Sequence, residues 1–161
     1  MTTNNNSTRE FLRHAVATVA YRGGKALRGA PESFAAFDPP PGDKTPAQIL
    51  AHMGDLYDWA LSMARGKQEW RNSTPLKWTQ EVERFFRTLQ AFDDYLASDA
   101  PLAFPWEKLF QGAIADSLTH VGQIAMLRRL AGCQMKGENY ARAEIVTGRV
   151  GFEQAPPKQE F

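Results

Sequence analysis

The sequence predicts an all-α fold, a four-helix bundle followed by an irregular C-terminal tail. Three observations support this fold class. Apolar residues recur at the three- and four-residue spacing of amphipathic helices in four segments of about 20 residues. No segment shows the strict alternation of apolar and polar residues that is typical of strands. Proline and glycine gather between the helical segments and after the last one. At 161 residues, the chain accommodates one domain with a substantial core.

The first predicted helix follows residues 1–7, which we expect to be a frayed, disordered N-terminus. Ser7 or Thr8 can cap this helix, which then runs for about 20 residues. Its core-facing side chains are Leu12, Val16, Val19 and Leu27. Residues 29–44 contain the run Pro39-Pro40-Pro41-Gly42, which removes backbone donors and predicts a long connection. A connection of this length fits two helices that are neighbours and equally two that lie across the bundle from each other.

The second helix has the clearest start signal in the chain. Thr45 is a suitable N-cap, Pro46 suits the first helical position, and Gln48 completes a capping box. We expect this helix to end near Arg65, before Gly66. Its apolar stripe contains one polar residue; the stripe is Ile49, His52, Leu56, Trp59 and Met63.

Two further helices and a tail complete the prediction. The third helix runs from about Trp78 to Ala97 and the fourth from about Glu107 to Ala131, where Gly132 can end it. The bundle therefore covers residues 8–132. Residues 133–161 form a tail that packs on the bundle, with a short helical turn near residues 139–145. We expect the tail to fold back across the cleft that would hold the candidate site described next.

Three polar residues interrupt the core-facing side of the fourth helix. Read at alternating four- and three-residue steps, that side is Leu109, Ala113, Asp116, His120, Gln123, Leu127 and Leu130. A carboxylate and an imidazole in such a position need a partner, and a divalent cation is an efficient one. Asp116 and His120 lie one helical turn apart and can coordinate the same ion. With His52 they predict an open metal site of two histidines and one aspartate.

The proposed ligands indicate a catalytic rather than a structural metal site. Three protein ligands leave coordination positions for water or substrate, and imidazole and carboxylate suit Zn²⁺, Ni²⁺, Mn²⁺ or Fe²⁺ without distinguishing among them. Gln123 can hydrogen-bond a ligand or a bound water. The alternative interpretation is structural: His52 as a core histidine, and Asp116 with His120 as a simple intrahelical pair.

Other residues with chemical potential fit less specific roles. We interpret His14 as a surface residue, and Asp55 and Asp58 as solvated carboxylates, with a supporting contact to His52 as the alternative for Asp55. Trp59 fits the core, whereas Trp70, Trp78 and Trp106 flank loops and can line a pocket, an interface or the core. Cys133 has no neighbouring histidine or second cysteine in the sequence, so a nucleophilic role is unsupported.

Composition excludes several functional classes. The net charge of +1 and the absence of a basic cluster give no case for nucleic-acid binding. No apolar run is long enough to predict a membrane span, and the N-terminus lacks the pattern of a signal peptide. A single cysteine forbids an internal disulfide, so a cytoplasmic location is our default expectation.

Two short motifs resemble the DinB-like proteins, a family also described as damage-inducible and as metal-dependent hydrolases. The first is Ala51-His52-Met53-Gly54-Asp55, and the second is Asp116-Ser117-Leu118-Thr119-His120-Val121-Gly122-Gln123. The family pattern has a histidine where this chain has Asp116. Two consequences stay open: a working site with a different metal preference, and a member that has lost its metal. The resemblance spans residues 8–132.

This resemblance implies a four-helix bundle, a divalent metal and a homodimer. It also implies an enzyme that uses the metal to activate water, as a hydrolase, or a low-molecular-weight thiol, as a transferase acting on a small-molecule substrate. The competing hypothesis is a non-catalytic helical module with a structural or vestigial metal site. Such a module would dimerise through spare apolar stripes, and its polar residues would fix the register of packing. One such stripe contains Phe110, Ile114, Val121 and Ile124.

Overall fold

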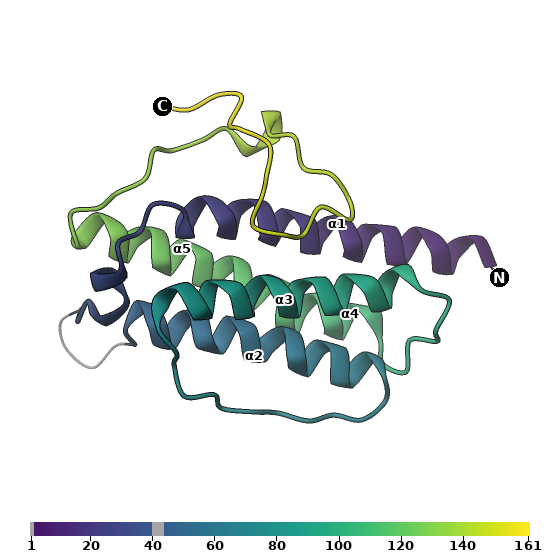
Figure 1. Ribbon diagram of the computed structural model, residues 1–161. Helices are drawn as coiled ribbons and strands as arrows, with labels where there is room; N and C mark the ends of the chain where they lie inside the picture. Colours follow the sequence, from purple (N-terminus) through teal and green to yellow (C-terminus); the bar gives the residue numbers. More distant parts are fainter. Residues whose placement is uncertain (1, 40–43) are drawn as a thin grey trace.

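The computed structural model describes residues 2–39 and 44–161 and confirms the all-α bundle (Figure 1). Three long helices are α1 (Thr2–Leu27), α2 (Pro46–Ala64) and α3 (Trp78–Ala97). The fourth consists of α4 (Trp106–Leu109), a π-helical segment η2 (Phe110–Ile114) and α5 (Ala115–Leu130). Short 3₁₀ helices lie at Glu32–Ala36 (η1) and Tyr140–Arg142 (η3). Among the described residues, pairing of the strand type is limited to one bridge between Glu138 and Glu160.

The helix boundaries follow the local sequence signals closely at α2 and α3. The capping box at α2 is present: Oγ1 of Thr45 accepts a hydrogen bond from the Gln48 N–H, and Oε1 of Gln48 accepts one from the Thr45 N–H. The first helix differs. It begins at Thr2 rather than at Ser7 or Thr8, because residues 2–7 contain no glycine or proline that would interrupt a helix.

The two longest connections are explained by which helices are neighbours. α2 packs against α3 and α5, and α1 packs against the same two helices, so α1 and α2 are diagonal in the bundle. The chain between α1 and α2 therefore connects two diagonal helices. α2 and α3 run parallel to each other, and the connection between them returns along the whole length of α2 (Figure 1). Short turns would have served only antiparallel neighbours.

In α1 and α3 the core consists of the apolar stripes that the periodicity predicted, whereas in α5 the predicted core-facing side is wrong at its end, where Leu130 is 59% exposed. Leu12, Val16 and Val19 of α1 are fully buried, as are Phe85, Leu89 and Phe92 of α3. The stripe proposed for dimerisation is part of this same core: Ile114, Val121 and Ile124 are at most 4% exposed. These three residues are therefore not free to form an interface, whereas Phe110 is partly exposed and lies beside the exposed Phe11.

The fourth helix contains a feature that its sequence did not predict. Residues 110–114 form a π-helical segment directly before α5, where we expected an uninterrupted α-helix from about Glu107 to Ala131. A π turn inserts an extra residue, so the backbone widens there. Ala113 and Ile114, which are consecutive, are consequently both fully buried.

The C-terminal tail packs on α1 and not across the space between α2 and α5 that holds the candidate site. Glu138, whose side chain is fully buried, accepts a hydrogen bond of 2.6 Å from the Tyr21 hydroxyl and pairs with Lys25 at 2.9 Å. Phe152 stacks edge-on against Phe86 of α3. In Figure 1 the tail lies above α1, on the side away from α2. Glu138 and Glu160 of the tail both pair with Lys25 of α1, which explains why our expectation of a cover over the site is wrong.

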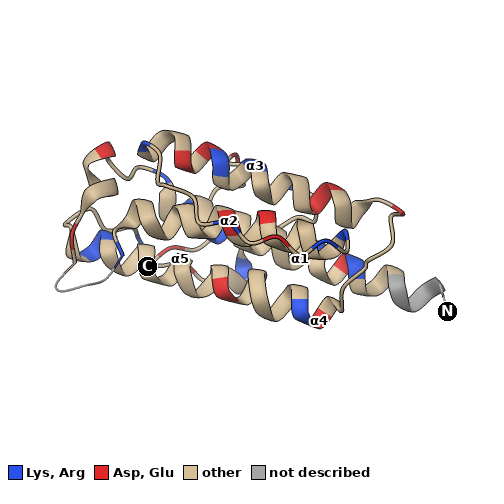
Figure 2. Cartoon of the chain, turned by 90° about the horizontal axis from the view of Figure 1, so that it is seen from below, with Lys and Arg blue, Asp and Glu red and all other residues tan. Residues whose placement is uncertain are grey.

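The charges are mixed along the helices. Figure 2 shows segments of both signs on the same helices, and this view has no extended surface of one sign. This agrees with the net charge of +1. In the described part of the chain, no helix combines the length and apolar character needed to cross a membrane.

Candidate metal centre

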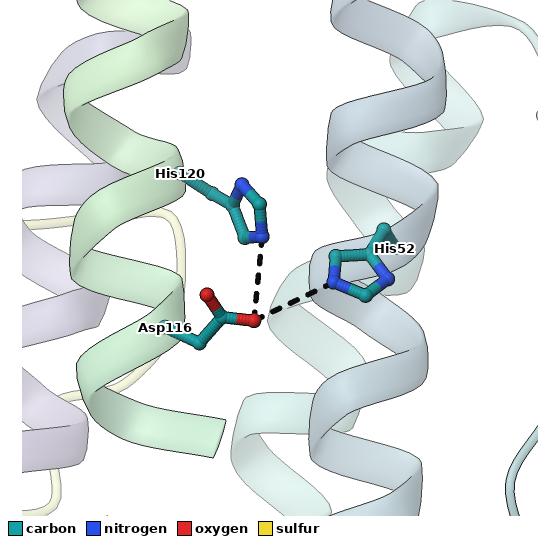
Figure 3. A group of neighbouring side chains, drawn as sticks. All are labelled: His52, Asp116 and His120. Carbon is teal, nitrogen blue, oxygen red and sulfur yellow. Dashed lines mark ion pairs between the residues drawn. The ribbon is translucent and has the colours of Figure 1, made fainter. Parts of the chain in front are cut away.

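The three predicted ligands come together between α2 and α5. His52 projects from α2, and Asp116 and His120 project from α5, one turn apart (Figure 3). One carboxylate oxygen of Asp116, Oδ2, lies 3.6 Å from Nε2 of His52 and 3.4 Å from Nε2 of His120. The two imidazole rings are 4.9 Å apart between centroids and nearly perpendicular. Ligand atoms of all three residues lie within 4.8 Å of one another.

These distances match the spacing of ligands around a metal ion. A direct hydrogen bond between nitrogen and oxygen is about 2.7–3.2 Å long, so both contacts to Asp116 are longer than that. Two ligand atoms that each lie about 2.0–2.1 Å from a tetrahedral metal are about 3.3–3.4 Å apart. The observed separations of 3.4 and 3.6 Å are close to that value. The donor set of two imidazoles and one carboxylate fits a divalent transition metal.

Gln123 fixes the tautomer of His120. Oε1 of Gln123 lies 2.7 Å from Nδ1 of His120. Because an amide oxygen only accepts hydrogen bonds, this contact places a proton on Nδ1, and in the neutral ring the lone pair is then on Nε2, the nitrogen next to Asp116. Gln123 is itself exposed, so it does not occupy the core-facing position that its spacing predicted. It nevertheless orients His120 in the way that an outer partner orients a metal-binding histidine.

His52 is held in the neutral form that binds metals. Burial lowers the pKa of His52, and the neighbouring imidazole of His120 and the charge of Lys44 lower it further. Asp116 acts in the opposite direction but does not outweigh these effects. A metal competes with protons for imidazole nitrogen, so a lowered pKa reduces the competition at neutral pH.

The site is open to solvent on the Asp116 side. The side chain of Asp116 is 43% exposed, compared with 22% for His52 and 12% for His120. The histidines are therefore partly enclosed between the helices, while the carboxylate faces outward. An ion held by these three residues would be reachable by a small molecule.

Behind His52 lies a buried ionic network that sequence reasoning missed. Arg84 of α3 donates a 3.0 Å hydrogen bond to Asp55 and a 2.9 Å one to Glu81. It also donates to the carbonyl oxygen of Ala51, next to His52. Burial acts to lower the pKa of Arg84, but the hydrogen bonds and charges of the two carboxylates outweigh it and raise the pKa. The network ties α3 to the segment of α2 that carries His52.

This network corrects our interpretation of Asp55, which is 3% exposed and not solvated. Gly54 also has a definite role, because a Cβ there would lie 3.2 Å from the guanidinium carbon of Arg84. The Gly54-Asp55 pair of the first motif thus serves the Arg84 network. A signal was present in the sequence: Glu81 and Arg84 are three residues apart on the face of α3 next to its apolar stripe.

The remaining candidate residues divide between core, surface and site. Trp78 is buried and packs edge-on against Phe34, and His14 is exposed, as expected. Trp70 contacts His52 directly, with 5.5 Å between ring centroids. Only the tertiary structure reveals that contact, because Trp70 belongs to the irregular connection between α2 and α3.

Comparison with models of known protein families, with curated proteins and with solved structures finds no match to this chain.

Proposed function

We propose that this protein is a metal-dependent enzyme of the DinB-like type. It would bind a divalent metal through His52, Asp116 and His120 and use that metal in catalysis. The observation that carries the proposal is the convergence of three ligand atoms from two helices within 4.8 Å. Two of them are imidazole nitrogens that lie 3.4 and 3.6 Å from one carboxylate oxygen. The sequence resemblance of the two short motifs supports the family assignment.

Each residue of such a site would have a separate role. His52 and His120 supply neutral nitrogen ligands, and Asp116 supplies a negative charge from the open side. Gln123 keeps Nε2 of His120 directed toward the site by accepting the proton on Nδ1. A divalent metal held there would act as a Lewis acid that lowers the pKa of a water or thiol it binds.

Two reaction classes fit an open site of this kind. In the first, water is the nucleophile and a small-molecule substrate is hydrolysed. In the second, a low-molecular-weight thiol is transferred to an electrophile. Cys133 takes no part in either, because it lies beyond the end of α5, close to Arg128, whose Nε donates to its carbonyl oxygen. Of the stripe given as an example interface for the alternative, a dimerising helical module, Ile114, Val121 and Ile124 are buried in the core.

Metal analysis of protein purified without an affinity tag tests the proposal. We expect near-stoichiometric divalent metal in the wild type, or its uptake after incubation with Zn²⁺, Ni²⁺, Mn²⁺ or Fe²⁺. His52→Ala and His120→Ala should each lose it. His14→Ala is the matched control, because His14 is an exposed histidine outside the site.

A wild type that takes up none of these metals would refute the proposal. Retention of metal in both site variants would refute the ligand assignment. If metal binds as expected, a panel of esters, amides and electrophile–thiol pairs distinguishes hydrolysis from thiol transfer. Turnover that persists without metal would contradict both reaction classes.

A further inference from the structure

The connection between α2 and α3 is irregular but firmly anchored. Both the backbone N–H and the hydroxyl of Ser73 donate to the carboxylate of Asp55, at 2.8 and 2.6 Å. Nearer its start, the N–H of Glu69 donates to the hydroxyl of Ser62 on α2. Asp55 is in turn held by Arg84. The segment between these anchors, which contains Trp70, is therefore fixed against α2.

The anchored segment places Trp70 at the edge of the candidate metal centre. Its ring lies 5.5 Å from the His52 ring and 5.7 Å from the Trp59 ring, edge-on to both. The indole N–H is already satisfied by a 3.0 Å hydrogen bond to Asn72. Trp70 nevertheless stays 41% exposed. Trp70 can therefore offer a ligand the apolar surface of its ring. The anchored segment holds that ring in place before a ligand binds.

Trp59 extends this apolar surface toward α5. It lies two turns after His52 on the same face of α2, and its Cζ3 atom approaches Gly112 of η2. A Cβ at Gly112 would lie 3.2 Å from that atom, so the missing side chain makes room for the indole. Because Gly112 lies one turn before Asp116 and Trp70 contacts His52, the Trp59–Trp70 pair lies next to the site.

We infer that the Trp59–Trp70 pair is a recognition surface for the aromatic part of a metal-coordinating anion. The inference rests on the proposed metal site and adds the substrate class. The anionic group would bind the metal, and an attached ring would pack against Trp70. Aromatic rings meet in offset or edge-on geometry at centroid distances of about 4.5–7 Å, and the pair already shows that geometry internally.

Two hydroxamates that differ only in their apolar group test this inference by binding rather than by turnover. Acetohydroxamate and benzohydroxamate share the metal-binding group, but only the second has a ring. Calorimetric titration of the metal-loaded protein gives the ratio of their dissociation constants. We expect this ratio to favour benzohydroxamate about tenfold more in the wild type than in Trp70→Ala. Trp106→Ala, which removes a tryptophan of similar exposure (39%) from α4, should keep the wild-type ratio.

A second variant distinguishes two roles of Trp70: recognition of the ligand's ring and positioning of His52. Trp70→Leu keeps an apolar cover on the imidazole without a ring, and we expect it to retain the metal and lose the preference. Equal ratios in the wild type and Trp70→Ala would overturn the inference while leaving the metal site intact. Loss of metal in both variants would also overturn it, since Trp70 would then serve only to position His52. A wild type that holds no metal and binds neither hydroxamate would overturn both proposals.

Discussion

The Arg84 network gives a sharp prediction about stability. Arg84→Met keeps most of the apolar stem of the side chain but removes the guanidinium. Asp55, which is 3% exposed, and Glu81, which is fully buried, would then lose their shared cation. Ser73 and the N–H of Leu76 would remain as donors to the two carboxylates, but neither carries a charge.

The magnitude follows from the burial of both carboxylates. Removing one partner of a buried ion pair costs about 3–5 kcal/mol, because an uncompensated charge remains in the interior. For a chain of this size, 1 kcal/mol corresponds to about 3 °C in melting temperature. Arg84→Met should therefore lower the melting temperature by about 9–15 °C.

Urea unfolding of metal-free protein, followed by circular dichroism, measures the change in the free energy of unfolding. Arg87→Met is the control, because Arg87 is exposed on the next turn of the same helix. Asp55→Asn and the double variant complete a mutant cycle, and we expect a coupling energy of at least about 1 kcal/mol between Asp55 and Arg84. A loss below about 1 kcal/mol for Arg84→Met, or one equal to the Arg87→Met control, would refute the reasoning.

Three further predictions concern the candidate site and the tail. Gln123→Leu should lower metal affinity by about 10- to 100-fold, because His120 loses the acceptor that orients it; competition with a chelator measures this, and unchanged affinity would contradict it. Since burial lowers the pKa of His52 below its ordinary 6.5, the folded state binds fewer protons than the unfolded chain just below that pH. The unfolding free energy of metal-free protein should therefore fall as the pH drops below 6.5. His52→Gln should remove part of that fall, and identical pH profiles would count against it. Glu138→Ala should cost about 1–3 kcal/mol of stability, because the Tyr21 hydroxyl loses its buried acceptor and Lys25 keeps only Glu160 as a partner, yet it should not change metal affinity; a parallel loss of metal would show that the tail supports the site.

The sequence by itself determined the helices and the candidate ligands. Capping at Thr45 and Gln48 and the apolar periodicity of α2 and α3 are local properties, so the pattern predicts those elements closely. The proximity of Asp116 and His120 is local for the same reason, since one helical turn places them side by side.

Only the tertiary structure decided how these elements meet. The diagonal placement of α1 and α2, the course of the tail along α1, and the contact of Trp70 with His52 all join residues that are distant in sequence. The Arg84 network also joins residues that are distant in sequence. A buried charge such as that of Arg84 is tolerated only where a side chain from another helix pairs with it. Helical periodicity specifies which face of a helix is buried, but not which neighbour covers it. That choice depends on the packing of the whole bundle.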